Sequence, residues 1–248
     1  MKATFFNKPL EWNIETKEES WTQGEVVKGT LRLKNHGTEL VSLENSGIAL
    51  AFAEIKKVHA RVPGALKLDA KTLFPESTIA AGTSLELPFA LPIAPNAPVS
   101  DKKGSMFLAY GRNLEENHLQ LSVNPRALFG KVIGLMDTFQ RFKLKEYKTV
   151  KQGVEYKLLP PTSRDMANID SLLLTFGMDQ DVLKLLFEFQ VKKIETSGVT
   201  NKIEKSSVKI EKSLTPKEYS LGRDMIHQDS LLKIIESVIG EVKIQAIF

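Results

Sequence analysis

A run of alternating apolar and polar residues constrains the fold of this chain more than any other feature. Residues 84–91 read SLELPFAL, so that leucine or phenylalanine occupies every second position. This period of two is typical of a strand with one buried face. Pro88 falls on the polar side, and a proline cannot donate a hydrogen bond inside a central ladder, so we expect an edge strand or a bulged one. Pro92, Pro95 and Pro98 then keep the chain extended until a strand resumes over residues 106–110.

The rest of the first half repeats this pattern in short segments. Turn residues separate the segments, for example Asn35-His36-Gly37. Many short strands with intervening turns and no convincing helical pattern favour a β-sandwich, which we assign to residues 1–124. The expected strands, in addition to those above, cover residues 14–17, 26–33, 41–43, 48–52 or 48–58, 66–73 and 119–123.

The pattern changes at Asn124. Asparagine is a good helix N-cap, and Pro125 suits the first turn of a helix. Apolar residues then recur at helical spacing up to Phe139, which indicates one buried helical face. We therefore expect a short connecting helix over residues 125–139, at the start of a second domain that spans residues 125–248.

Strand patterns return after the connecting helix and predict a second antiparallel sandwich. A further helix follows, capped by Asp229 or Ser230, with an apolar stripe from Leu231 to Ile239 and an end at Gly240. Residues 242–248 are expected to form the last strand. The other expected strands of this half cover residues 142–144, 154–158, 172–176, 183–191 and 208–214. The predicted fold class is therefore all-β, with two antiparallel sandwiches in tandem, a connecting helix and a helix near the C-terminus.

Composition narrows the functional class. The chain has 248 residues, of which 42% are hydrophobic and 26% charged, and these values are typical of globular proteins. The sequence holds no cysteine, so disulfides and thiol chemistry are excluded and a reducing compartment is favoured. It shows no secretory signal and no apolar run of the roughly 20 residues that span a bilayer. We expect a cytoplasmic protein.

The net charge of +4 lies in the second half of the chain. Basic residues concentrate in two segments, 141–157 and 192–217. A charge of this size does not indicate nucleic-acid binding. Solvated strand faces and protected strand edges explain the lysines most simply, and weak binding to an anionic membrane surface is the alternative.

Candidate chemical groups are scattered. The four histidines, His36, His59, His118 and His227, show none of the clustering of zinc ligands. Asp179-Gln180-Asp181 offers two carboxylates for calcium but fits a hairpin turn better. Glu115-Glu116-Asn117-His118 places carboxylates beside an imidazole, yet a solvent loop is expected there. We assign no catalytic, cofactor-binding or metal-ligating residue, expect no cofactor, and predict that the chain is not an enzyme.

Two apolar features have both a structural and a binding interpretation. Trp12 and Trp21 flank the first strand, where they belong to the core or form an exposed aromatic docking patch. The stripe over residues 231–239 packs on its own domain or contacts a membrane or partner. Its polar face carries Lys233, Glu236 and Ser237 without a basic bias, so we favour packing.

Five segments together resemble the arrestin-like superfamily. They are residues 24–35 (GEVVKGTLRLKN), 85–100 (LELPFALPIAPNAPVS), 125–144, 156–161 (YKLLPP) and 182–191 (VLKLLFEFQV). Their order is similar to that in the bacterial sporulation-control branch. The resemblance implies an arrestin fold and a non-enzymatic, cytoplasmic regulatory or scaffolding role. No segment matches the buried charged cluster with which visual and related arrestins sense phosphate, so that mechanism is not transferred.

The sequence thus predicts a protein that binds partner proteins through sandwich edges and concave faces. Two alternatives remain open. One is a β-sandwich module that binds a carbohydrate or small ligand, which predicts exposed aromatic side chains along a groove with convergent polar groups. The other is a peripheral membrane adaptor that uses the basic segments 141–157 and 192–217.

Overall fold

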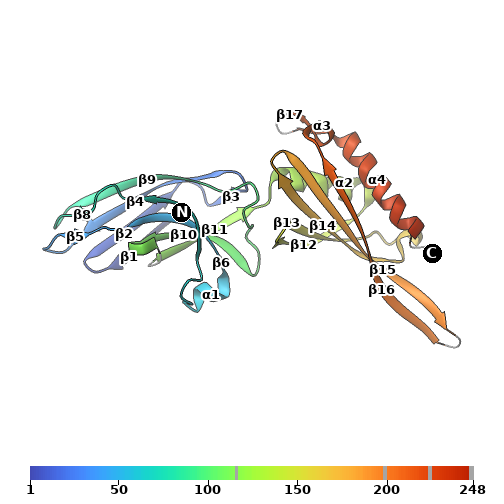
Figure 1. Ribbon diagram of the computed structural model, residues 1–248, viewed down its shortest axis with the longest axis horizontal. Helices are drawn as coiled ribbons and strands as arrows, with labels where there is room; N and C mark the ends of the chain where they lie inside the picture. The colour runs from blue at the N-terminus through green and yellow to red at the C-terminus, as the bar shows by residue number, and fades with distance from the viewer. Residues whose placement is uncertain (115–116, 198–199, 223–224, 246–248) are drawn as a thin grey trace. The chain divides into compact units, whose positions relative to one another are not determined.

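The computed structural model describes residues 1–114, 117–197, 200–222 and 225–245. The chain divides into two compact units, Met1–Asn124 and Pro125–Phe248. Figure 1 shows the first unit in blue to green and the second in green to red. The division falls where the alternating pattern of the sequence stops.

The first unit is a sandwich of two sheets (Figure 1). All pairings in the two sheets are antiparallel except that of β3 with β11, which is parallel. A small sheet pairs β5 (Val41–Ser42) with β8 (Thr78–Ile79), and Arg112–Leu114 forms a 3-10 turn. The four-stranded sheet has the order β1 (Lys2–Asn7), β2 (Leu10–Thr16), β4 (Val26–Asn35), β9 (Ser84–Pro92). The five-stranded sheet has the order β3 (Ser20–Thr22), β11 (Asn117–Asn124), β10 (Gly104–Gly111), β6 (Gly47–Glu54), β7 (Lys67–Leu73).

Strand β9 confirms the expectation drawn from its alternating sequence. It pairs only with β4 among the described strands and so lies at the edge of the four-stranded sheet. Leu87, Phe89 and Leu91 are buried in the core, whereas Pro88 is exposed. The proline therefore occupies an edge strand, where its missing N–H group is tolerated.

One expected strand stops earlier than the sequence suggested. Strand β6 does not continue to Val58, because the chain turns into the short helix α1 (Ile55–His59) after Glu54. One helical turn brings Val58 back against Ala53 and Phe107, and all three side chains are buried together. An ion pair of 2.6 Å between Lys57 Nζ and Glu54 Oε1 spans the same turn.

The second unit contains one five-stranded antiparallel sheet and two longer helices (Figure 1). A small sheet joins β17 (Ser220–Gly222) to β18 (Met225–Ile226), and Arg164–Met166 is a 3-10 turn. The sheet has the order β12 (Lys143–Val150), β13 (Gly153–Leu159), β14 (Ile169–Asp179), β15 (Val182–Ser197), β16 (Thr200–Leu214). The helices are α2 (Ala127–Gln140), α3 (Pro216–Tyr219) and α4 (Gln228–Gln245).

The layer that covers this sheet differs from the one expected for a second sandwich. Antiparallel strands dominate both units, which confirms the all-β class, but helices α2 and α4 take the place of a second sheet. Phe129 of α2 stacks on Phe176 of β14 with ring centroids 4.9 Å apart. Both types of layer bury the same one-sided apolar face, so the alternating strands alone do not distinguish them.

Helix α2 confirms the connecting helix with shifted ends. Its N-cap is Arg126, without a side-chain hydrogen bond, and Asn124 is not the cap because it ends strand β11. The Asn124 carbonyl accepts a hydrogen bond of 3.1 Å from the N–H of Gln23. Phe139, expected on the buried face, is 49% exposed near the end of the helix.

Helix α4 is longer than its sequence pattern indicated, and the strand expected over residues 242–248 is wrong where the structure describes it. The helix runs through Gly240 to Gln245, because Val242 extends the apolar stripe and is fully buried. A glycine costs a helix only about 1 kcal/mol, which this burial offsets. Residues 246–248 lie outside the described residues. Neither Asp229 nor Ser230 caps the helix; the Nδ1 of His227 accepts a hydrogen bond of 3.4 Å from the Ser230 N–H.

An ion pair ties the end of α4 to the Arg164–Met166 turn, and it should set the titration of Asp165. The Nζ of Lys243 donates to Asp165 Oδ2 at 2.5 Å. This bond, with one from Ser163, lowers the pKa of Asp165 from 3.8 to about 2. The contribution of the pair to stability is therefore complete above pH 3.8 and is lost as the pH falls through about 2.

Carboxyl-carbon NMR should find the Asp165 midpoint near pH 2 and, in Lys243→Met, a midpoint shifted up toward the ordinary value. Lys233→Met removes the same charge from the exposed side of the same helix and should leave the Asp165 midpoint in place. Equal midpoints in Lys243→Met and wild type would contradict the ion pair.

Candidate functional site

The edges of the sheets are the first place to look for a binding surface, because an edge strand offers unpaired backbone groups to an extended partner. Natural edges are usually protected by prolines, charges or short length. Strand β9 carries Pro88 and Pro92, and β3 is only three residues long. Lysines are spread along β7, β12 and β16. Strand β1 is the edge with least protection among the described strands.

Strand β1 instead presents two neighbouring aromatic side chains. Phe6 is 64% exposed and Phe5 is 39% exposed. Phe5 lies opposite the buried Trp12 of β2 and therefore lies on the inner face of the sheet, which faces the core. Phe6 lies opposite Glu11, on the outer face. The Phe6 ring is 6.5 Å from the ring of His36. An apolar edge of this kind is what a partner strand would use.

The first strand expected from the sequence begins at residue 14, so β1 was not predicted. A signal was present, because residues 3–6 read ATFF, rich in β-formers, and Asn7 and Pro9 mark a turn before β2. The segment is short and lacks alternation, which is why the period-two pattern did not identify it.

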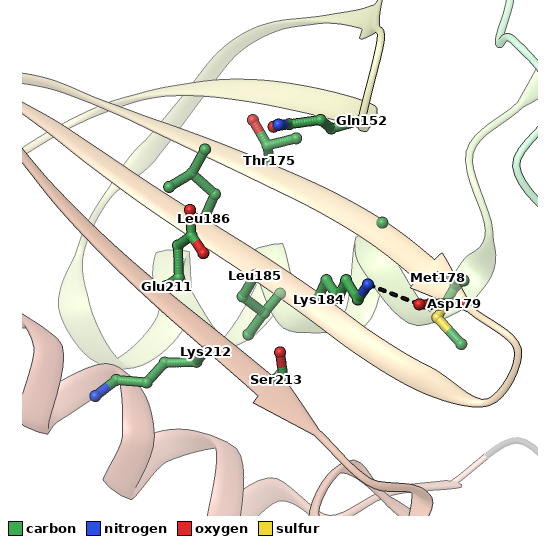
Figure 2. A pocket seen from close by; sticks show the side chains of 11 residues that line it. Gln152, Thr175, Met178, Asp179, Lys184, Leu185, Leu186, Glu211, Lys212 and Ser213 are labelled. Carbon is green, nitrogen blue, oxygen red and sulfur yellow. Dashed lines mark hydrogen bonds and ion pairs between the residues drawn. The ribbon is translucent and has the colours of Figure 1, made fainter.

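A surface pocket lies in the second unit, on the face of the sheet that bears Thr175 and Leu186 (Figure 2). Its volume is about 370 Å³. An ion pair of 2.7 Å between Lys184 Nζ and Asp179 Oδ2 stands at one side. The hydrogen bond and charge of Lys184 lower the pKa of Asp179. No unpartnered buried polar side chain among the described residues points to a ligand here.

The four histidines lie in separate places. His36 Nε2 is 2.5 Å from Glu11 Oε2, His227 accepts the hydrogen bond at the start of α4, and His59 lies in α1. His118 lies in β11, with its ring edge-on to Phe107 at 5.8 Å. Within the described parts of the chain, no group of three or more candidate ligands is placed to hold a metal ion.

The two acidic motifs lie in different parts of the fold. Asp179 ends β14, Gln180 has a φ of 52°, and Val182 begins β15, so the hairpin turn expected there is confirmed. Glu115 and Glu116 lie outside the described residues. Their neighbours Asn117 and His118 belong to β11 rather than to a solvent loop.

The core interpretations of the two apolar features are confirmed. Trp12 is fully buried and Trp21 is 2% exposed, so neither forms a docking patch. The α4 stripe from Leu231 to Ile239 is buried within its own unit. Among the described residues, no helix has the length and apolar character needed to cross a membrane.

Part of each basic segment lies next to strand β14, the first in β13 and the second at the end of β15. Asp170 of β14 lies between them, and its pKa is lowered by the hydrogen bond of Lys192 and by the charges of Lys192, Lys205 and Lys157. Glu155 likewise raises the pKa of Lys148 through a hydrogen bond. Five lysines of the segments pair with carboxylates, which offset the positive charge locally: Lys143 with Asp137, Lys148 with Glu155, Lys192 with Asp170, Lys209 with Glu188, and Lys212 with Glu241.

Comparison with known proteins identifies the fold. No protein-family model and no curated protein matches the chain. A beta-glucosidase from Listeria innocua in complex with gluconolactone is 14% identical over 46% of this chain and 16% of its own, at a TM-score of 0.29 that supports no argument. The crystal structure of Spo0M, sporulation control protein, from Bacillus subtilis is 15% identical over 95% of this chain and 99% of its own, with a TM-score of 0.61. The chain therefore has the arrestin-like fold of the sporulation control protein, which confirms the resemblance of its sequence at the level of the fold.

Proposed function

We propose that this chain is a non-enzymatic regulatory or scaffold protein that binds a partner protein by adding an extended segment of that partner to strand β1. The exposure of Phe5 and Phe6 on the free edge of a four-stranded sheet carries the proposal. One side of β1 pairs with β2 over residues 2–7, and the opposite side pairs with no described strand.

The physics of strand addition suits this edge. Backbone hydrogen bonds to an added strand give affinity, and side chains that flank the strand give specificity. Phe5 and Phe6 point to opposite faces of the sheet, so a bound segment would contact one aromatic ring on each face. Aromatic side chains at the centre of an interface commonly contribute more than 2 kcal/mol to binding.

Two further observations support the proposal. The chain shares its fold with a protein described as a sporulation control protein, which is a regulatory description. The absence of cysteine favours a reducing compartment, so we propose a cytoplasmic location.

Phe6→Ser should strongly reduce capture of the partner. Tagged wild-type protein is incubated with lysate of the source cells, and bound proteins are quantified by mass spectrometry. The specific partner should fall at least about tenfold with Phe6→Ser, because truncation of a central aromatic anchor removes 2 kcal/mol or more. Phe6 is exposed, so Phe6→Ser should change the free energy of unfolding by no more than about 0.5 kcal/mol.

Leu40→Ser is the matched control, because Leu40 is also 64% exposed and lies in the same unit but outside strand β1. It should retain the partner at the wild-type level. The affinity of the purified partner is then measured for all three proteins. Equal recovery by wild type, Phe6→Ser and Leu40→Ser would show that β1 is not the binding edge.

A further inference from the structure

A cavity of about 530 Å³ opens in the first unit between strand β1 and strands β10 and β11. Its walls come from residues 3–5 of β1, from Val58 and residues 61–66, and from Tyr110, Asn117 and His118. Cavities of 300–1,000 Å³ are typical of sites for small organic ligands. The cavity adjoins β1, but it is a space between side chains and does not depend on strand addition.

Asn117 gives this cavity a feature that packing alone does not explain. The residue is only 3% exposed, yet neither its amide nitrogen nor its amide oxygen has a hydrogen-bond partner among the residues that the structure describes. Buried polar groups are nearly always hydrogen-bonded, and each exception needs an explanation. The asparagine side chain has a donor NH2 group and an acceptor oxygen, so it is complementary to a group that offers both an acceptor and a donor, such as a secondary amide.

Tyr110 belongs to the same wall. It is the cross-strand partner of Asn117, so the two side chains share one face of the sheet. Tyr110 is 2% exposed, and burial raises the pKa of its phenol, which keeps the hydroxyl protonated and able to donate. The wall therefore combines a hydroxyl near the end of β10 with an amide at the start of β11.

The described lining of the cavity carries positive charge. Arg61 lines it, and no acidic side chain does so among the described lining residues. Burial, together with the charges of His59 and Arg61, lowers the pKa of His118. The rest of the lining is largely apolar, with Phe5, Val62 and Leu66 among the contributors.

We infer that this cavity binds a small carboxylic acid that carries an apolar body and a secondary amide, of the size of an N-acylated amino acid. Arg61 would pair with the carboxylate, and Asn117 would exchange two hydrogen bonds with the amide. Phe5 and Leu66 would contact the apolar body. The inference gives the small-ligand alternative a location and a ligand chemistry.

The test uses the full chain and three probes of graded chemistry. N-acetyl-phenylalanine has all three groups, N-acetyl-phenylalanine amide lacks the charge, and 3-phenylpropionate lacks the amide. Binding is followed by amide chemical shifts. Binding of N-acetyl-phenylalanine should saturate, with chemical-shift changes at the amides of Arg61, Tyr110 and Asn117. Each of the other probes should bind at least about tenfold more weakly, a difference of about 1.4 kcal/mol.

Two variants test the two contacts separately. Arg61→Gln, at an exposed position, should lower the affinity for N-acetyl-phenylalanine at least about tenfold. Asn117→Leu should weaken the binding of N-acetyl-phenylalanine by a similar factor and should leave the affinity for 3-phenylpropionate unchanged. Its melting temperature should stay the same or rise, because the substitution removes an unpaired buried amide. Ser46→Ala is the matched control, since the Ser46 hydroxyl is also buried without a partner but lies outside the cavity lining. It should bind as wild type does.

Three results would overturn the inference. They are a lack of saturation up to about 10 mM probe, shifts that map away from the cavity, and wild-type affinity in both Arg61→Gln and Asn117→Leu. Because no partner protein is present, none of these results bears on strand addition at β1.

Discussion

Replacing Phe129 with alanine should lower the free energy of unfolding of the second unit by about 3–5 kcal/mol. Phe129 is 1% exposed and stacks on Phe176, whose ring also meets Tyr156 edge-on at 5.3 Å. This aromatic cluster joins helix α2 to strands β13 and β14. Truncation removes the ring contacts and leaves a cavity where the helix meets the sheet, and neighbouring backbone can close such a cavity only in part.

The effect should be measured by urea unfolding, with separate fits for the two units if two transitions are seen. Phe139→Ala is the control, since it deletes the same ring from the same helix at a site that is 49% exposed. Its cost should stay near or below 1 kcal/mol. Similar losses in the two variants would mean that the Phe129–Phe176 contact does not anchor the helical layer.

Gly153→Ala should destabilise the second unit by more than about 2 kcal/mol. Gly153 begins strand β13 with a φ of +142°, a conformation that residues with a side chain rarely adopt. A Cβ atom there would lie 1.9 Å from the carbonyl oxygen of Phe176 on the neighbouring strand. Strand β14 must move to admit the methyl group, and this movement disturbs the pairing at the centre of the sheet.

Gly134→Ala provides the matched substitution. Gly134 is exposed on helix α2, and no atom lies within 4 Å of a Cβ built there. Alanine should therefore stabilise the helix by up to about 1 kcal/mol. Both free energies come from the same urea experiment. A Gly153→Ala variant as stable as wild type would show that the hairpin does not need glycine at this position.

The sequence predicted best where a local pattern reports on one face of one element. Alternation in residues 84–91 identified β9, and the position of Pro88 in that pattern placed the strand at an edge. The burial of the stripe that begins at Leu231 followed from a local pattern of the same kind, at helical spacing. These predictions succeed because a strand or helix repeats its orientation every few residues, so neighbouring side chains carry the information.

Predictions failed where distant contacts outweighed a local preference. Gly240 is a helix breaker by itself, but burial of Val242 two residues later continues α4. Asn124 is a good cap by itself, but its pairing with Thr22 holds it in strand β11. In each case the tertiary contact exceeds a local preference of about 1 kcal/mol.

The sequence by itself determined the strands whose apolar residues alternate clearly, the change of pattern at Asn124 and the exposed face of β9, because hydrophobic periodicity is a local property. Only the tertiary structure decided that helices cover the second sheet, that β1 forms a free aromatic edge, and that Arg61, Tyr110 and Asn117 share one cavity. Those three residues come from a loop and two strands that approach one another only when the sheet pairs, and no short-range pattern encodes that meeting.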